Sequence, residues 1–350
     1  MSIKKKISAE IIADSKNEFG ERITTFVVTF PRIVLAELNT HRVFSRNSAS
    51  SRAIPFEKMV KMVQEDPFIP IAWQKDHKGM QGKEYFDMEG SITKRESYWL
   101  HGRNEAVKTA KMLGESETTK QLCNRLLEPF MWHTAIITAT EYENFFVLRC
   151  PQYTIREEEV FRSRKDFLKF YQEQGVDIEC IFAREEDNVA WLKSNTSGAE
   201  IHISRLAECM WDAFNESKPK KLKAGEWHIP FGDNIHKDKL SDVTDITDLA
   251  CIKETYIKIA TARCARVSYF NFEGKDDYEA DIKLHDRLAS MGHWSPFEHC
   301  AKAMNFSDYD LSDNKVFHKE TGVEFCDGWS GNFRGFIQYR KMFNNENITK

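Results

Sequence analysis

The first thirty residues constrain the fold most, because apolar and polar positions alternate in two runs separated by a turn. Residues 7–13 and 23–30 have the period of two that is typical of β-strands, and residues 17–20 between them are turn-forming. Two such runs, so close along the chain, predict an antiparallel hairpin. A sheet containing this hairpin is therefore the expected foundation of the fold.

A short helix and a polar segment follow the hairpin. Residues 30–38 predict the helix, because Pro31 suits a first helical turn and the apolar residues after it can share a buried face. Residues 39–52 combine small residues and hydroxyls with three arginines: Arg42, Arg46 and Arg52. Small residues let backbone N–H groups approach an anion, and arginines supply charged forks. This loop indicates a phosphate site, and an ordinary Ser-rich surface loop is the alternative.

Length and composition limit the number of domains and the class of protein. A chain of 350 residues allows one large domain or two ordinary ones, and 41% hydrophobic residues allow a sizeable core. The net charge of -4 disfavours bulk nucleic-acid binding. No apolar run is long enough for a membrane span, and the start lacks the apolar stretch of a signal peptide. The eight cysteines lie singly, without zinc-site spacing, so we expect reduced thiols, no metal and a cytoplasmic location.

Residues 41–52 resemble the signature of the flavin-dependent thymidylate synthases, Arg-His-Arg-x-x-Ser-x-Asn-Glu-x-Ser-x-Arg-Tyr. Six positions agree with it: His41, Arg42, Ser45, Asn47, Ser50 and Arg52. Three positions differ: Thr40 replaces the first Arg, Ser48 the Glu, and Ala53 the Tyr.

Three further blocks resemble the same family. Residues 120–149 predict a helix, a β-branched strand and a helix closing on Leu-Arg, as in the family. Residues 198–202, Gly-Ala-Glu-Ile-His, are similar to its Ala-Gln-x-Glu-Ile-Arg. Residues 264–268 and 292–299 are similar to its Ala-Arg-Val-Ser and Gly-His-x-Ser/Thr-Pro-Phe-Glu-His. The last block precedes the His-Arg signature in the family but follows it here, which a circular permutation would produce.

The resemblance implies one permuted catalytic domain over residues 1–350. Its fold would be α+β, with a mixed or antiparallel sheet flanked by helices, of the thymidylate synthase-complementing protein type. Residues of about 56–115 and 152–197 are expected to be helical insertions, and about 308–350 a C-terminal extension. Family members are homotetramers with active sites between subunits, so we expect a homotetramer, or a homodimer if the insertions interfere.

The implied activity is the reductive methylation of dUMP to dTMP, with methylenetetrahydrofolate, FAD and NADPH. The implied catalytic residues are His41, Arg42, Ser50 and His202. Those implied to bind FAD are His41, Arg42, Arg149, Ser268, His293, Ser295 and Glu298. Those implied to bind the nucleotide are Glu37, Ser50, Ser51, Arg52, His202 and Arg205. We expect His41 and His293 to titrate near neutral pH, which suits proton handling, and a charged His41 or Arg42 to stabilise a reduced flavin.

Departures from the family leave other functions open. Glu37 stands where the family has a glutamine, and His202 replaces an arginine that orients the base, with Arg205 as a substitute one turn along the helix. These changes allow hydroxymethylation of the nucleotide or the use of dCMP. They also allow a nucleotide-binding homologue without catalysis. Nucleic-acid binding through the arginines of residues 42–52 is disfavoured by the acidic balance.

Other segments keep two interpretations. Residues 73–82 form either an active-site lid or a polar loop. Residues 329–341 either close over a ligand or form a capping strand. Arg149 taken alone would be a structural ion pair, and His293 with His299 is not expected to bind metal, because no carboxylate cluster completes the set. Residues 215–250 indicate linker and surface, and Cys150 is not expected to be a nucleophile.

Overall fold

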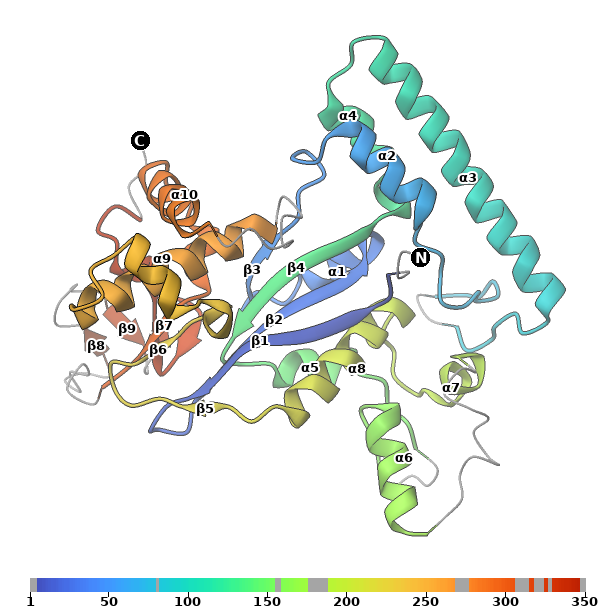
Figure 1. The fold of residues 1–350 in the computed structure, drawn as a ribbon. Coiled ribbons are helices and arrows are strands. Elements are labelled where there is room, and N and C mark those ends of the chain that lie inside the picture. Colours follow the sequence, from blue (N-terminus) through green and yellow to red (C-terminus); the bar gives the residue numbers. More distant parts are fainter. Residues whose placement is uncertain are drawn as a thin grey trace.

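The computed structural model describes residues 5–79, 82–154, 159–175, 188–267, 277–305, 315–317, 324–326 and 329–346. A five-stranded sheet, in the order β3-β4-β2-β1-β5, lies at its centre (Figure 1). Its strands are β1 (Ser8–Lys16), β2 (Arg22–Pro31), β3 (Ser45–Ser48), β4 (Trp132–Ala139) and β5 (Lys220–Lys221). The predicted hairpin β1–β2 is confirmed. All neighbouring pairs are antiparallel except β1–β5, so the sheet is mixed.

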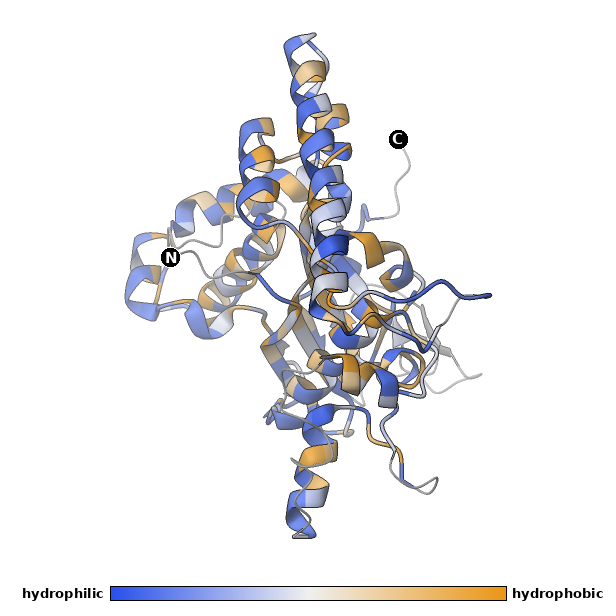
Figure 2. Cartoon of the chain, turned by 90° about the vertical axis from the view of Figure 1, so that its right-hand side faces the viewer, coloured by the Kyte–Doolittle hydropathy of each residue, from blue (hydrophilic) through white to orange (hydrophobic). Residues whose placement is uncertain are grey.

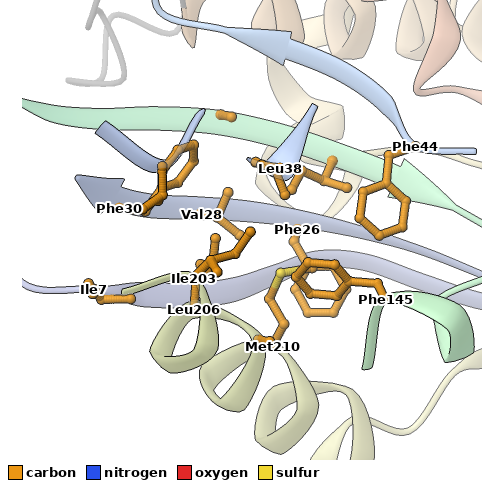
Figure 3. Packing of buried hydrophobic residues seen from close by; sticks show 14 of the residues in the cluster. Ile7, Phe26, Val28, Phe30, Leu38, Phe44, Phe145, Ile203, Leu206 and Met210 are labelled. Carbon is orange, nitrogen blue, oxygen red and sulfur yellow. The ribbon is translucent and has the colours of Figure 1, made fainter. Parts of the chain in front are cut away.

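Helices pack on this sheet because β2 alternates. Phe26, Val28 and Phe30 project to one face and meet apolar side chains of α8 (Ile201–Glu216), as Figure 3 shows. On another side of the sheet Ile136 of β4 packs with Cys264 of α9 (Leu249–Arg266). The fold is thus α+β with a helix-flanked sheet, as the sequence indicated.

A second sheet is built late in the chain. It has the order β12-β7-β6 and is antiparallel throughout: β6 is Trp227–His228, β7 is Ala301–Ala303 and β12 is Phe336–Gln338. Two strand pairs accompany it: β10 (Trp329–Ser330) with β11 (Phe333–Arg334), and β8 (Lys315–Phe317) with β9 (Glu324–Cys326). The linker interpretation of residues 215–250 is therefore wrong in part, because β5 and β6 join sheets and His228 is fully buried.

The two expected insertions contain helices. Residues 56–115 include α2 (Phe56–Glu65) and α3 (Glu89–Glu115), and residues 152–197 include α6 (Arg164–Glu173) and α7 (Asn188–Ser194). Both views place α3 and α6 at opposite ends of the molecule, and α3 is mostly hydrophilic (Figures 1 and 2).

Further helices and 3₁₀ turns complete the described part of the chain. They are α1 (Leu35–Leu38), α4 (Lys120–Arg125), α5 (Glu143–Arg149), α10 (Tyr278–Ser290) and the 3₁₀ turns η1 (Arg32–Val34), η2 (Glu128–Phe130), η3 (Gly232–Asn234), η4 (Lys237–Asp242), η6 (Ser295–Glu298) and η9 (Tyr339–Met342). Within the described residues, no helix has both the length and the apolar character that crossing a membrane requires.

Candidate functional site

The segment after the first helix is only partly a loop. Residues Ser45–Ser48 form β3, which pairs with β4 from Ser45 opposite Thr138 to Ser48 opposite Ala135. The loop expectation is wrong here because the edge of β4 offers hydrogen bonds that no local pattern reveals. Pairing makes the side chains alternate, so Ser45 and Asn47 are buried while Arg46 is half-buried.

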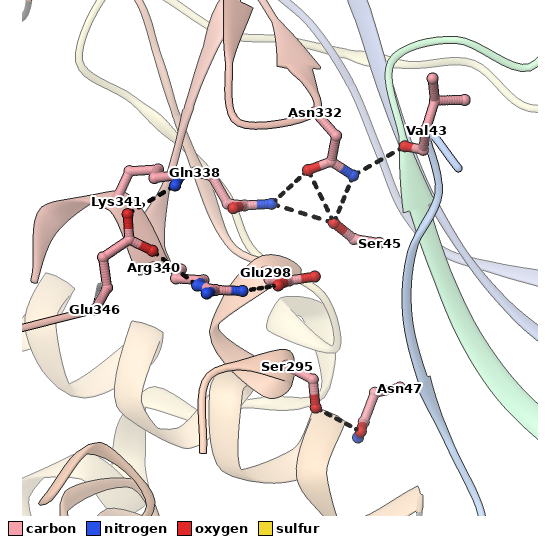
Figure 4. A network of polar contacts seen from close by, with 10 residues as sticks. All are labelled: Val43, Ser45, Asn47, Ser295, Glu298, Asn332, Gln338, Arg340, Lys341 and Glu346. Carbon is pink, nitrogen blue, oxygen red and sulfur yellow. Dashed lines mark hydrogen bonds and ion pairs between the residues drawn. The ribbon is translucent and has the colours of Figure 1, made fainter. Parts of the chain in front are cut away.

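Asn47 joins three segments that lie far apart in the sequence. Its Nδ2 donates to the carbonyl oxygen of Cys264 at 2.5 Å, and its Oδ1 accepts from Ser295 Oγ at 3.2 Å (Figure 4). These residues come from the His-Arg block, the block at 264–268 and the block at 292–299. The fold thus brings together blocks whose sequence order suggested a permutation.

The C-terminal segment also packs on β3. Asn332 Nδ2 donates to the carbonyl of Val43 and to Ser45 Oγ, both at 2.8 Å, and Gln338 Nε2 donates to the same Ser45 Oγ at 3.1 Å (Figure 4). Residues 336–338 pair as β12 with β7. The capping-strand interpretation of residues 329–341 is therefore the one that the structure supports, and its amide side chains hold the signature in place.

His41 and Arg149 form a pair. Arg149 Nε donates to His41 Nε2 at 3.0 Å, so the imidazole carries its proton on Nδ1 and is neutral. His41 is 7% exposed and lies against the rings of Phe44 and Phe145. Burial, followed by the charges of Arg149 and Arg46, lowers the pKa of His41 to about 4. The expectation that His41 titrates near neutral pH is wrong, and a charged His41 cannot be the cation at this site.

Arginines supply the positive charge instead. Arg42 is exposed and makes no hydrogen bond within the described residues. Arg46 donates to the carbonyls of Leu38 at 3.1 Å and His41 at 3.4 Å. Burial and then the nearby Arg42 lower the pKa of Arg46, whereas Glu298 raises it, which shows that these groups share one neighbourhood. Together with Arg149, the cluster suits an anion.

The two expected phosphate serines differ in availability. Ser51 is buried, and its Oγ donates to Glu128 Oε1 at 2.5 Å. Asn124 Nδ2 also donates to the backbone carbonyl of Ser51 at 2.8 Å. Ser51 therefore anchors the chain, and its expected role in phosphate binding finds no support. Ser50 is half-buried, with no side-chain hydrogen bond among the described residues.

Arg52 lies in the same stretch and is exposed. Its Nε donates to Gln121 Oε1 at 3.1 Å, an exposed contact that a phosphate can displace.

Among the expected flavin-side residues, Glu298 contacts the C-terminal segment. Glu298 accepts from Arg340 Nη1 at 2.5 Å, and Arg340 Nε also pairs with Glu346 at 2.8 Å (Figure 4). His293 is exposed, and Ser268 lies outside the described residues. His299 is fully buried and shares a hydrogen bond with Thr138 Oγ1 at 2.8 Å through Nδ1, so it belongs to the core.

His202 serves as a structural residue at the start of α8. Its Nδ1 bonds to Glu200 Oε1 at 2.6 Å, its Nε2 accepts from the backbone N–H of Ile71 at 3.2 Å, and it is 4% exposed. Both ring nitrogens are thus occupied, and the expected catalytic and base-binding roles of His202 find no support.

Arg205 and Glu37 lie in different surroundings. Arg205 Nη1 donates to Glu208 Oε2 at 2.6 Å. The Arg205 side chain lines a cavity whose lining includes none of these site residues: His41, Arg42, Arg52, Arg149 and Ser295. Its expected place beside the substrate base is therefore not supported. Glu37, on α1, has one buried carboxylate oxygen without a hydrogen-bond partner in the described part of the chain.

Sequence reasoning missed three site residues: Asn332, Gln338 and Arg340. They belong to a segment without a counterpart in the family signature, and only the presence of Gly, Asn, Gln and Arg in it indicated a contact with a ligand. Among the described residues, no group of three or more His, Cys, Asp or Glu side chains is arranged to hold a metal ion.

Comparisons with known proteins give limited information. No family model matches the chain, and no curated protein matches it. Among solved structures, it is similar to the UMP/dUMP methylase PolB from Streptomyces cacaoi bound with 5-Br dUMP (11% identity, TM-score 0.36, 50% of this chain and 90% of that one). The same enzyme bound with 5-Br UMP gives 13% identity, a TM-score of 0.35 and coverages of 49% and 88%. TM-scores below 0.5 do not establish a common fold, so function is inferred from the motifs and the geometry.

Proposed function

We propose that this chain is a flavin-dependent enzyme that methylates dUMP to dTMP with methylenetetrahydrofolate and NADPH. The observation that carries the proposal is the meeting at Asn47 of three sequence blocks that resemble one enzyme family. The block at 41–52 lies more than two hundred residues before the other two along the chain, and a shared ancestry with that family gives a reason for their meeting at one place.

The residues fit the phosphates of FAD. A diphosphate needs several cations, and Arg42, Arg46 and Arg149 supply them from two segments, with Arg42 free of other hydrogen bonds within the described residues. When bound, the flavin supplies hydride transfer, while the protein supplies orientation and electrostatics.

Each side chain has a defined task in this proposal. Arg149 fixes the ring of His41 and keeps it neutral, so Arg42 provides the positive charge. Ser50 and Arg52 bind the nucleotide phosphate. Asn47 holds the first and last blocks together, so that both sides of the site keep their spacing.

A second function is a nucleotide-binding homologue without catalysis. Glu298, expected to bind FAD, is bonded to Arg340, and His202, expected to be catalytic, has both ring nitrogens bonded to protein groups. Such a protein would bind nucleotide but would neither retain flavin nor oxidise NADPH. A related enzyme acting on dCMP or transferring a hydroxymethyl group would keep the flavin.

The visible spectrum of the purified protein, before and after addition of FAD, separates these functions. We expect flavin bands that persist through gel filtration. These bands should weaken in Arg149→Ala but not in Arg287→Ala, the control at an exposed residue. NADPH oxidation with dUMP compared with dCMP then identifies the substrate. A colourless protein that releases added FAD would reject the enzyme and favour the nucleotide-binding homologue.

We also propose a homo-oligomer. Val147 and Leu148 are 48% and 54% exposed on α5, directly before Arg149, and such apolar side chains beside a site suit a subunit contact. Light scattering after gel filtration should give a dimer or tetramer mass, whereas a monomer mass would contradict this.

A further inference from the structure

A partly enclosed cavity lies away from the proposed flavin site. A cavity of about 630 Å³ is bounded by the start of the chain, both expected insertions and α8. Its lining includes Ile7, Ile71, Tyr153, Trp191 and Ile201. This volume is within the range of pockets that hold cofactors and other small molecules.

The walls of the cavity combine aliphatic surface with a hydrogen-bonding group. Half-buried aliphatic side chains form much of the lining, among them Ile71, Leu100 and Leu192, and Asn195 contributes a half-buried amide. A planar ring would pack between such side chains, and the amide at its edge would fix its orientation.

The charge of the lining is positive. Five basic side chains face three acidic ones: Lys5, Lys6, Arg103, Arg164 and Arg205 against Glu65, Asp66 and Glu208. Positive charge in a partly enclosed, low-dielectric space attracts anions more strongly than the same charge on an open surface.

Arg205 is the best placed of these cations. The carboxylate of Glu208, 2% exposed, is shared between Arg164 Nε at 3.1 Å and Arg205 Nη1 at 2.6 Å. Arg164 is 12% exposed, whereas the side chain of Arg205 is 36% exposed and makes only this one hydrogen bond to the described residues. A guanidinium group has five N–H donors, so Arg205 keeps donors for a ligand.

We propose that this cavity binds an organic anion that carries a planar heteroaromatic ring, with the anionic group on Arg205 and the ring packed on the aliphatic wall. A nucleoside phosphate and a reduced folate share this chemistry. The site is separate from the one containing His41 and Arg149, and the inference does not rest on the proposed function.

Isothermal titration calorimetry with AMP, dUMP and 5-formyltetrahydrofolate tests the proposal on the whole protein. At least one probe should bind, and Arg205→Ala should weaken it at least tenfold, while Arg205→Lys loses less. Glu208 keeps Arg164 in these variants, so the fold should persist. Leu192→Trp, which fills the cavity from α7, should also weaken binding.

The control variants assign the binding to one of the two sites. Binding at the cavity should be unchanged in Arg52→Ala, Arg149→Ala and the exposed Arg287→Ala. Arg205→Ala should leave FAD retention unchanged, as well as any dUMP binding that depends on Arg52. Binding of AMP or dUMP identifies the ligand as a nucleotide, and binding of the folate identifies it as a pterin anion. Failure of all three probes to bind, or affinity that depends on Arg149 but not on Arg205, overturns the proposal.

Discussion

At the scale of residues, Asn47 determines whether distant blocks stay together. Its amide donates with nitrogen to a backbone carbonyl and accepts with oxygen from a serine, so both halves of the side chain are used. Asn47 is 8% exposed, and a buried carbonyl left without its donor destabilises the native state.

Asn47→Asp tests this geometry with almost no change of shape. The carboxylate still accepts from Ser295 but places an oxygen against the carbonyl of Cys264. We expect the free energy of unfolding, measured by urea denaturation, to fall by about 1–3 kcal/mol. FAD retention, measured by absorbance on the same preparation, should fall with it. Unchanged stability would show that the contact to Cys264 is not formed.

Arg52→Ala tests the phosphate assignment. Arg52 is exposed and bonds only to Gln121 among the described residues, so its removal should leave the melting temperature unchanged. Nucleotide affinity should fall at least tenfold, because a charged fork to the phosphate is lost. Titration of dUMP, with Arg287→Ala as the matched control, measures this. Equal affinities in the two variants would refute the assignment.

At the scale of elements, the strands at the C-terminal end act as a clamp. The turn before β12 contains Gly335, whose φ is +71° and whose carbonyl accepts from Asn17 Nδ2 at 2.8 Å. This contact ties the first hairpin to the second sheet. A side chain at Gly335 would collide with that neighbour, since an added Cβ would lie 2.6 Å from Asn17 Nδ2.

Gly335→Ala should therefore destabilise the protein more than a comparable glycine elsewhere. Gly225 has a φ of +80°, but an added Cβ there would meet only the end of Lys302, at 3.9 Å. Gly225→Ala should lower the free energy of unfolding by about 1–2 kcal/mol from backbone strain alone, and Gly335→Ala by about 2–4 kcal/mol. Denaturant titrations compare them, and equal losses would contradict the clamp.

At the scale of the whole molecule, a buried polar chain crosses the contact between the two sheets. It runs from Ser15 to His228 at 2.9 Å, then to Thr25, Thr138 and His299, each step being 2.8 Å. Burial lowers the pKa of both histidines to about 3. The interior therefore accommodates these rings only in the neutral form.

This burial predicts a loss of stability in acid. His41, at about 4, and His133, at about 3, are depressed in the same way, against an ordinary pKa near 6.5. The unfolded chain therefore takes up protons that the native state refuses. The stability gained by keeping these histidines neutral is fully present above pH 6.5 and is lost as the pH falls toward 3–4. Between pH 7 and 5.5 the free energy of unfolding should fall by about 1 kcal/mol per histidine.

Urea unfolding at pH 7 and pH 5.5 measures that loss. His228→Asn should reduce the difference between the two pH values by about 1 kcal/mol, whereas the exposed His101→Asn on α3 should not. Identical pH dependence in His228→Asn and wild type would argue against the neutral buried histidine.

The sequence by itself determined the local elements and the composition of the proposed site. Its periodicities predicted the hairpin, the strand from Trp132 and the helices around residues 201 and 249, because these patterns are short-range and match the geometry of single elements. The signature residues also made Arg42 and Arg149 candidates before any geometry was known.

Only the tertiary structure decided which of those residues are available and in what state. The edge of β4 turned part of a polar loop into β3, and burial beside Arg149 made His41 neutral. Ser51 and His202 are hydrogen-bonded to residues far away along the chain, and Arg205 lines a different cavity. Desolvation and pairing depend on residues far along the chain, and no local pattern carries that information.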